Sequence, residues 1–276
     1  MREEAFRDGD RVLPLLTSAV IPAGVRHGFT TRAGGVSAGA FATLNLGGRW
    51  GDADDAVAEN RRRVQRAAGG AIAIATQVHG VAMTRVRAAD DLDAIARRAA
   101  DGLCTDLPGA PVGVYVADCI PVLLADARTG AVAAVHAGWR GSVAGVVPAA
   151  VARMAAEFGT RPGDLRVALG PAIGPCCFEV GDEVVDAVAA VISDAVAIGV
   201  VLRGGRKPHV DLKRLNGLLL ERAGVPAAHV DAGAECTSCD RTRFFSYRRD
   251  AGRTGQMMGF IAAAPAPAPA PPATVG

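Results

Sequence analysis

The chain has 276 residues, half of them hydrophobic, and its 30 basic and 28 acidic side chains give a formal net charge of +2. This balance and the scattered arginines argue against general nucleic-acid binding, and no apolar run approaches the roughly 20 residues needed to span a membrane. The N-terminus is charged and lacks the apolar segment of a secretory signal, so we expect a cytoplasmic protein. In that compartment the six cysteines are expected to be thiols or metal ligands rather than disulfides.

The first quarter of the chain predicts a strand, two polar loops and a helix. Residues 20–28 are apolar enough for a strand. The glycine-rich loop 30–37 could bring its backbone close to a ligand, although an ordinary surface loop is the alternative. Asn45 opens a second loop of the same kind. Asp54–Ala68 carries acids early and arginines late, which is typical of a helix, and its three consecutive arginines are expected on a solvated face.

The middle of the chain predicts the chemical centre. Its short, β-branched apolar runs are typical of buried strands, and they cover residues 112–117, 122–125 and 131–135. Cys119 follows the first run and His136 follows the last. Side chains at strand ends beside glycine-rich turns are well placed for a site. A thiol and an imidazole so placed indicate either a metal or a nucleophile with its base.

His79 repeats this placement, because it follows a further apolar run, residues 71–75, that predicts a buried strand. A single histidine is more often structural than a ligand. Three such positions together favour a metal, since zinc and copper prefer imidazole and thiolate ligands. The spacings of 40 and 17 residues between His79, Cys119 and His136 match no compact motif, so the fold must assemble this site.

The second half of the chain alternates helices, strands and turns. Residues 142–158 predict a largely buried helix whose N-terminus would lie near His136 and could hold an anion, and Leu165–Leu169 predicts a strand. The adjacent Cys176 and Cys177 are expected to pack in the core rather than to bind one ion. The CxxC at residues 236–239 has no second CxxC, so a zinc ribbon is not expected.

The C-terminal part combines aromatic and basic residues in the segment 244–250, FFSYRRD. Aromatic rings can stack on a flat base and arginines can hold a phosphate or carboxylate, while a final strand with a solvated edge is an equally open interpretation. No repeat or boundary divides residues 1–262, which therefore predict a single α/β domain. Residues 263–276 are an Ala-Pro tail of polyproline character, expected to be disordered and dispensable.

Together these motifs resemble the YfiH family, whose laccase domain-containing members are variously called polyphenol oxidases and purine nucleoside phosphorylases. The matching segments are TRAGGVS from Thr31, NLG from Asn45, Glu59-Asn60-Arg61, TQVHG from Thr76, ADCIP from Ala117, HAGWRG from His136, GPAIGPCC from Gly170 and FSYRRD from Phe245. The resemblance implies a single-domain, mixed-sheet α/β fold, distantly like the cysteine hydrolases of the cytotoxic-necrotizing-factor type.

The resemblance also implies that His79, Cys119 and His136 form a His-Cys-His site that is both metal-binding and catalytic, with zinc as the ion and copper as the alternative. We predict Asn45, Arg140 and Arg248 as substrate-binding residues. The chain departs from the family at Gln256, where relatives often carry arginine. If that arginine holds an anion in them, another arginine of this segment must replace it.

The activity that the resemblance implies is phosphorolysis of adenosine, inosine and methylthioadenosine, with adenosine deamination as a side activity. The expected partners are purine nucleosides and phosphate, with no nucleic acid and no membrane, and the protein is expected to be a monomer. Copper-dependent polyphenol oxidation is an alternative, although five histidines are few for several copper centres. The others are a cysteine hydrolase of cell-wall-related substrates, with Cys119 as nucleophile and His136 as base, and a zinc-stabilised interaction module.

Overall fold

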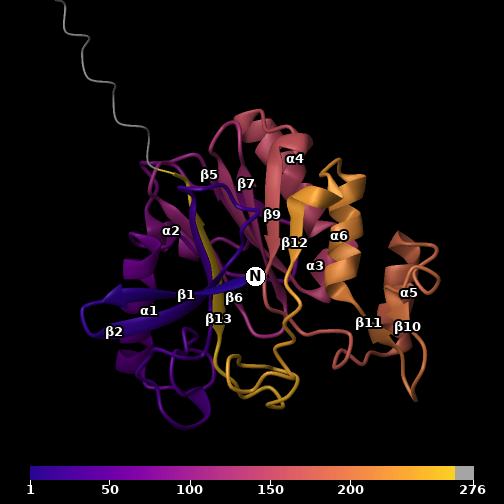
Figure 1. Cartoon of the computed structure of the whole chain (residues 1–276), viewed down its shortest axis with the longest axis horizontal. Coiled ribbons are helices and arrows are strands. Elements are labelled where there is room, and N and C mark those ends of the chain that lie inside the picture. The colour runs from indigo at the N-terminus through magenta and orange to yellow at the C-terminus, as the bar shows by residue number, and fades with distance from the viewer. Residues whose placement is uncertain (265–276) are drawn as a thin grey trace, which may run out of the picture.

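The computed structural model describes residues 1–264, in which two β-sheets pack face to face and helices cover their outer faces (Figure 1). The first sheet has five strands in the order β1-β2-β3-β13-β6, and all neighbouring strands are antiparallel. Its strands are β1 (Arg2–Asp8), β2 (Arg11–Thr17), β3 (Arg26–Thr30), β13 (Met257–Ala262) and β6 (Pro111–Val116).

The second sheet is mixed and has six strands in the order β12-β9-β7-β8-β5-β4. Its two outermost pairs are parallel and its inner pairs are antiparallel. Its strands are β12 (Val230–Ala232), β9 (Leu165–Leu169), β7 (Ile120–Asp126), β8 (Val132–Ala137), β5 (Gly102–Thr105) and β4 (Met83–Arg85). A short hairpin of β10 (Val201–Leu202) and β11 (His209–Val210) lies apart from both sheets.

The apolar pattern of β7 shows how the layers are held. Every residue of this strand is buried. Val122 and Leu124 face the helices beyond the second sheet, whereas Leu123 and Ala125 face the first sheet. Because side chains alternate along a strand, a continuous apolar run is what a strand covered on both faces requires. The mixed-sheet, single-domain α/β fold predicted from the sequence is therefore confirmed.

The helices divide between the two outer faces. Helix α1 (Asp54–Ala68) packs on the first sheet, while α4 (Val146–Phe158) and α6 (Leu212–Arg222) pack on the second. Helix α5 (Asp182–Val191) contacts α3 and shares the apolar core of the second sheet's helices. The two remaining helices are α2 (Leu92–Ala96) and α3 (Trp139–Ala144), and three 3-10 turns are η1 (Gly39–Phe41), η2 (Pro162–Asp164) and η3 (Ala227–His229). The bounds of α1 and β9 agree with the sequence prediction.

Four sequence predictions about the elements are wrong. The strand expected at residues 20–28 begins only at Arg26, because the preceding residues form turns. Residues 71–75 form a single bridge from Ala73 to Val112 rather than a strand. The helix expected at 142–158 begins three residues earlier, at Trp139, and is divided at Gly145, which has a left-handed φ of 87°. His136 lies within β8 rather than after it.

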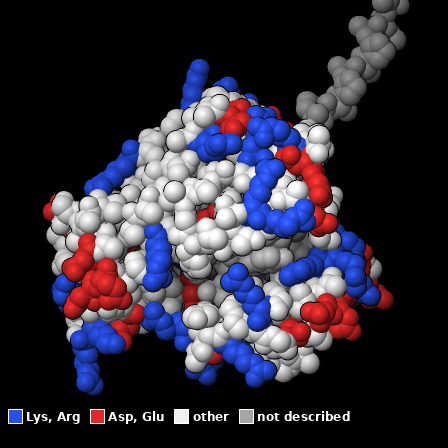
Figure 2. Space-filling view, turned by 180° about the vertical axis from the view of Figure 1, so that it is seen from behind, with Lys and Arg blue, Asp and Glu red and all other residues white. Residues whose placement is uncertain are grey.

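Charges of both signs are interspersed on the face opposite to that of Figure 1. Figure 2 shows Lys and Arg side chains mixed with Asp and Glu on this face of the molecule, without a continuous basic surface. Among the helices of residues 1–264, none combines the length and apolar character needed to cross a membrane. The Ala-Pro tail predicted from residue 263 falls almost wholly outside the described residues. Of its first residues, Ala263 pairs with Pro108 in a parallel bridge.

Candidate metal centre

The structure brings together the three residues predicted as a metal site. Cys119 lies in the turn between β6 and β7, His136 lies in β8, and His79 lies in the loop before β4. Their ligand atoms all lie within 4.8 Å of one another. The two imidazole rings are edge to face, with centroids 4.8 Å apart and planes at 80°. His136 is buried, Cys119 is partly buried and His79 is exposed, so the group opens towards solvent on the side of His79.

Asp101, which the sequence analysis did not select, holds two of these residues in place. Its Oδ1 lies 2.9 Å from Nδ1 of His136 and accepts the backbone N–H of His79 at 2.9 Å. Its Oδ2 accepts the backbone N–H groups of Val78 and Gly80. A carboxylate bonded to one ring nitrogen fixes the orientation of a histidine, and leaves the other nitrogen for a metal. Asp101 is fully buried, as a positioning residue of this kind requires.

Two residues of the site have an unusual backbone conformation. His79 has φ of 60° and Asp118 has φ of 86°, and positive φ is uncommon for residues other than glycine. The Asp118 carboxylate accepts hydrogen bonds from Thr237 Oγ1 at 2.6 Å, Ser246 Oγ at 3.0 Å and the Arg248 backbone N–H at 2.7 Å. These bonds tie the turn that carries Cys119 to the C-terminal loops and support its strained backbone.

Gly138 sets the space around the site at the start of α3. A Cβ atom at this position would lie 3.0 Å from Cys119 Sγ and 3.0 Å from His79 Cδ2. These contacts are tighter than ordinary van der Waals distances, so any larger residue would displace one of these two side chains. The glycine of the HAGWRG motif therefore serves close packing, since its own φ of −76° suits any residue.

The electrostatics of the group favour an ionised Cys119. Burial opposes ionisation of its thiol, but the charge of His136 and hydrogen bonds with both histidines outweigh burial and lower the pKa of Cys119 to about 6. Burial likewise opposes the charged form of His136, while Cys119 and Asp101 raise the pKa of His136 to about 9. A thiolate is the form of cysteine that binds a metal or attacks a substrate.

The residues predicted to bind substrate have different surroundings. The amide of Asn45 is buried, and all its hydrogen-bonding positions are used by Gly47, Asp52 and the backbone of Gln256. The exposed guanidinium of Arg140 lies 4.3 Å from the ring centroid of Trp139. Among residues 1–264 it has no hydrogen bond or ion pair. The substrate-binding roles of Asn45 and Arg140 stay predictions.

The aromatic and basic segment 244–250 is divided between core and surface. Phe244 and Phe245 are fully buried, whereas Tyr247 is 53% exposed and lies against Trp50, with ring centroids 6.1 Å apart. Of the segment's aromatic side chains, Tyr247 therefore has the exposed ring that could stack on a base. Nη1 of Arg248 donates to the carbonyl oxygens of Cys177 and Glu179. Its substrate-binding role also stays a prediction.

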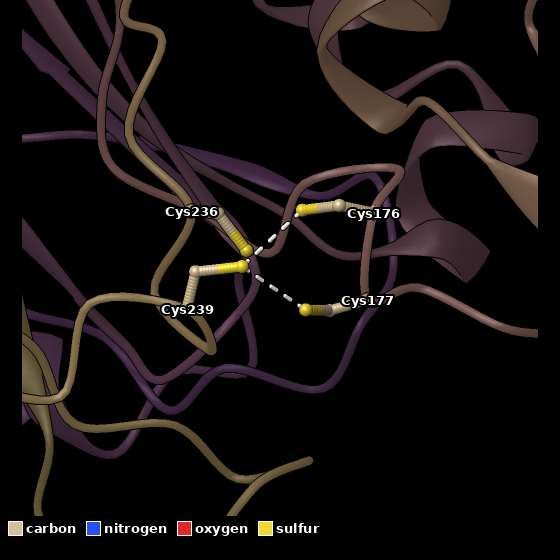
Figure 3. Close-up of side chains that lie close together, drawn as sticks. All are labelled: Cys176, Cys177, Cys236 and Cys239. Carbon is tan, nitrogen blue, oxygen red and sulfur yellow. Dashed lines mark hydrogen bonds between the residues drawn. The ribbon is translucent and has the colours of Figure 1, made fainter.

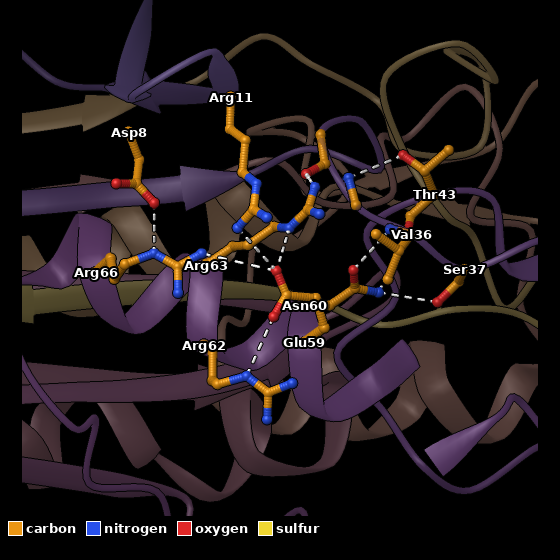
Figure 4. Close-up of polar contacts among 12 residues, drawn as sticks. Asp8, Arg11, Val36, Ser37, Thr43, Glu59, Asn60, Arg62, Arg63 and Arg66 are labelled. Atoms are coloured by element: carbon orange, nitrogen blue, oxygen red, sulfur yellow. Dashed lines mark hydrogen bonds and ion pairs between the residues drawn. The ribbon is translucent and has the colours of Figure 1, made fainter. Parts of the chain in front are cut away.

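The Glu59-Asn60-Arg61 motif has a structural role in holding the glycine-rich loops (Figure 4). Asn60 Nδ2 donates to Ser37 Oγ. It also donates to the carbonyl oxygens of Thr43 and Asn45. Its Oδ1 accepts the backbone N–H of Val36. The expectation that the three consecutive arginines of α1 are simply solvated is wrong for two of them. Arg61 donates to the carbonyl of Leu46 and Arg63 to the carbonyl of Gly34.

The structure also assembles four thiols that the sequence analysis treated separately. Cys176, Cys177, Cys236 and Cys239 come from two turns, and their sulfur atoms lie within 4.8 Å of one another (Figure 3). The expectation that both cysteines pack in the core is wrong for Cys176, which is exposed. Cys177 is partly buried and packs against the core. The sequence signal was the CxxC, but its partner is an adjacent Cys-Cys pair rather than a second CxxC.

The fold and the site define a two-sheet α/β protein with a candidate His-Cys-His metal centre. The donor set fits a metal, because two imidazoles and a thiolate suit zinc or copper and leave further positions open. The chain belongs to the family described as multi-copper polyphenol oxidoreductase laccase, whose sequence profile matches residues 26–264. This is the YfiH family predicted from the motifs.

Relatives in this family carry a different functional name. The chain is 38% identical over 247 residues to a protein of Geobacillus stearothermophilus named purine nucleoside phosphorylase YlmD, covering 87% of this chain and 90% of that protein. It is 42% identical over 254 residues to a purine nucleoside phosphorylase of Deinococcus radiodurans, covering 90% and 92%. It is also 41% identical over 174 residues, 62% of this chain and 66% of the relative, to adenosine deaminase RL5 of an unknown prokaryote.

Solved structures agree with the fold. The YfiH protein of Bacillus licheniformis superposes with a TM-score of 0.84 at 33% identity, covering 94% of this chain and 98% of that one. The structure of YlmD from Geobacillus stearothermophilus gives the same TM-score at 34% identity and covers 95% and 99%.

Proposed function

We propose that this chain is a purine nucleoside phosphorylase that cleaves adenosine, inosine and methylthioadenosine with phosphate, with adenosine deamination as a side activity. The observation that carries the proposal is the convergence of His79, Cys119 and His136 at one solvent-facing point. Relatives named purine nucleoside phosphorylase and adenosine deaminase, matched over most of the chain or a large part of it, support the same reaction classes.

We assign a distinct task to each residue of the site. His79, Cys119 and His136 hold the metal, zinc in our proposal, and Asp101 orients His136 for this role. A metal held here would supply a Lewis acid able to polarise a substrate group or to activate water. The exposed ring of Tyr247 offers a surface on which a purine can stack.

Phosphate needs cationic partners, which in this proposal are Arg140 and Arg248. Phosphorolysis depends mainly on holding phosphate against the ribose carbon while the base leaves, so positioning and electrostatics carry most of the catalysis. The Arg140 guanidinium makes no ion pair with residues 1–264 and is stacked on Trp139, so it can bind an anion at little cost. Arg249 is less suitable, because its guanidinium already bonds Asp250 and three backbone carbonyls.

Copper-dependent phenol oxidation, which the family description suggests, is less well supported. A multicopper centre needs many histidines, and among residues 1–264 only His79 and His136 belong to a metal-ligand group. The ring nitrogens of His27, His209 and His229 contact other groups: the backbone of Ser18 and Val25, the carbonyl of Pro175, and the guanidinium of Arg166, respectively.

A cysteine hydrolase is the second candidate, because a thiolate beside an imidazolium is also an activated nucleophile. Replacing the thiol separates the two functions. If Cys119 is a ligand, Cys119→Ser should lower bound metal and nucleoside turnover together. If Cys119 is a nucleophile, the variant should keep its metal and lose turnover and labelling by iodoacetamide.

Cys104→Ala is the matched control for this comparison. Cys104 is fully buried in β5, and burial raises the pKa of its thiol to about 11. The Cys104→Ala variant should therefore retain the metal content, the turnover and the Cys119 labelling of the parent protein. Retained metal in Cys119→Ser would contradict the proposed ligand role.

A further inference from the structure

We infer that Cys176, Cys177, Cys236 and Cys239 form a second metal site, a closed tetrathiolate that binds a soft tetrahedral ion, zinc in the first instance. The site is separate from the His-Cys-His centre, shares no ligand with it and does not depend on the proposed enzymatic activity. Figure 3 shows the four sulfur atoms directed into one space from two turns.

The sulfur positions match what such an ion requires. Cys239 Sγ lies 3.5 Å from Cys176 Sγ and 3.3 Å from Cys177 Sγ, and all four sulfurs lie within 4.8 Å of one another. Zinc–sulfur bonds of about 2.3 Å place the corners of a tetrahedron about 3.8 Å apart. A disulfide would need sulfurs about 2.05 Å apart, and all four cysteines are free. The cluster is therefore spaced for a central ion rather than for cross-links.

Backbone pairing holds the two turns side by side. One turn follows β9 and the other follows β12, and these strands are parallel neighbours in the second sheet. The segments that follow β9 and β12 are paired as well. Ala172 forms a parallel bridge with Cys236, and the Thr237 N–H donates to the Ala172 carbonyl. The backbone N–H of Gly174 also donates to Cys236 Sγ at 3.2 Å. The ligands are thus presented by a sheet edge, which favours a site of fixed geometry.

Three cationic side chains donate hydrogen bonds to backbone carbonyl oxygens in or beside the two turns. Lys213 Nζ donates to the carbonyl oxygens of Gly233 and Glu235, the latter at 2.8 Å. Arg249 Nη1 donates to the carbonyl of Thr237 at 2.8 Å, and Arg248 Nη1 donates to that of Cys177 at 3.2 Å. A divalent ion with four thiolates carries a net negative charge, which Lys213 and Arg248 partly offset, whereas the Arg249 guanidinium is already paired with Asp250. Four protein ligands also leave no open position, so the site is structural rather than catalytic.

The consequence for the first centre follows from Thr237, which lies between Cys236 and Cys239. Its hydroxyl donates to Asp118, the neighbour of Cys119, at 2.6 Å. The backbone N–H of Arg248 donates to the same Asp118 carboxylate, and its guanidinium donates to the carbonyl of Cys177. Arg248 therefore links Asp118 to the turn that carries Cys177. A metal in the tetrathiolate would therefore fix the loops that support Cys119 and Arg248.

The test is a metal count combined with X-ray absorption at the zinc edge, on protein purified with reductant. The double variant Cys236→Ala/Cys239→Ala should lose about one zinc per chain relative to the parent protein. Ser238→Ala, in the same turn, is the matched control and should lose none. Unchanged zinc in the double variant would overturn the inference.

A second variant keeps all four thiols, in case the double variant fails to fold. His79→Ala disables the first centre, so its remaining zinc should be surrounded by about four sulfurs at about 2.3 Å and no imidazole. A mixed nitrogen and sulfur shell, absence of zinc, or an intact mass two hydrogens short from a disulfide would each contradict the inference. The X-ray absorption spectrum does not depend on nucleoside turnover. The proposed function can therefore fail while the tetrathiolate site is confirmed.

Discussion

Nδ1 of His136 lies 2.9 Å from Oδ1 of Asp101, in a buried pair that joins β8 to the residue preceding β5. The same carboxylate collects the N–H groups of Val78, His79 and Gly80. One buried anion therefore positions both histidines of the centre, one through its ring and the other through its backbone.

Replacing this carboxylate should weaken the metal centre. Asp101→Asn keeps the size of the side chain but loses its charge, so we expect metal affinity to fall about 10- to 100-fold, as for other residues that orient metal ligands. Competition with a chelator measures the change. The control is Asp106→Asn, whose carboxylate pairs with Arg85 and is 44% exposed, and which should leave the affinity unchanged. Equal affinities for the two variants would contradict the positioning role.

Gly138→Ala tests the packing around the three proposed ligands. The new Cβ would lie 3.0 Å from Cys119 Sγ and from His79 Cδ2, so one of these side chains must move. We expect a lower metal content and a turnover reduced by about a hundredfold, since small displacements of catalytic groups are costly. Gly163→Ala serves as the control, because its Cβ would meet nothing within 4 Å. A fully metallated and active Gly138→Ala protein would contradict this account.

The sequence was sufficient to predict that His79, Cys119 and His136 come together, but not which residue supports them. His79, Cys119 and His136 stood out because each follows an apolar run, and a buried strand end is a common place for a site. Asp101 has no such signal, since its role depends on β5 pairing with β8 and on the folded loop at residues 78–80. The same limit explains the error at 71–75, where an apolar run packs against the first sheet with only one bridge.

Asn60→Ala should destabilise the protein without altering the metal centre directly. The variant would remove three donated hydrogen bonds of the fully buried Asn60 amide and leave the part-buried backbone N–H of Val36 without its acceptor. We expect a loss of about 3 kcal/mol in the free energy of unfolding, measured by chemical denaturation. Arg62→Ala on the exposed side of α1 should cost less than about 1 kcal/mol. Similar losses for both variants would show that the Asn60 network is not stabilising.

Asp126 should make stability depend on pH at the turn between β7 and β8. Its Oδ1 accepts the backbone N–H groups of Arg128 and Thr129 at 2.8 and 3.0 Å. Burial opposes ionisation, but hydrogen bonds to the carboxylate outweigh it and lower the pKa of Asp126. A lowered folded-state pKa contributes stability that is present above the ordinary value of about 3.9 and is lost as the pH falls through the lowered value.

Asp126→Asn should therefore cost about 1 kcal/mol at pH 7 and much less at pH values below the lowered pKa. Denaturation curves of both proteins across the acid range measure this difference. A loss that stays constant with pH would contradict the assignment. This turn lies at the opposite ends of β7 and β8 from Cys119 and His136, so we expect unchanged metal content.

The four-cysteine cluster shows a second limit of sequence reasoning. A CxxC without a matching CxxC gave no reason to expect a metal, and adjacent cysteines are unusual partners. Only the parallel pairing of β9 with β12 brings the turn at Cys176 and Cys177 to the turn at Cys236 and Cys239. The local motifs were visible in the sequence, whereas their juxtaposition depends on strand order.

The most direct test of the proposed function is the appearance of ribose 1-phosphate from inosine, followed by phosphorus NMR, with and without added phosphate. We predict that ribose 1-phosphate and hypoxanthine form together only when phosphate is present, and that Cys119→Ser abolishes both while Cys104→Ala does not. A metal-loaded protein that forms neither product, yet oxidises phenols once copper is supplied, would contradict the phosphorylase assignment.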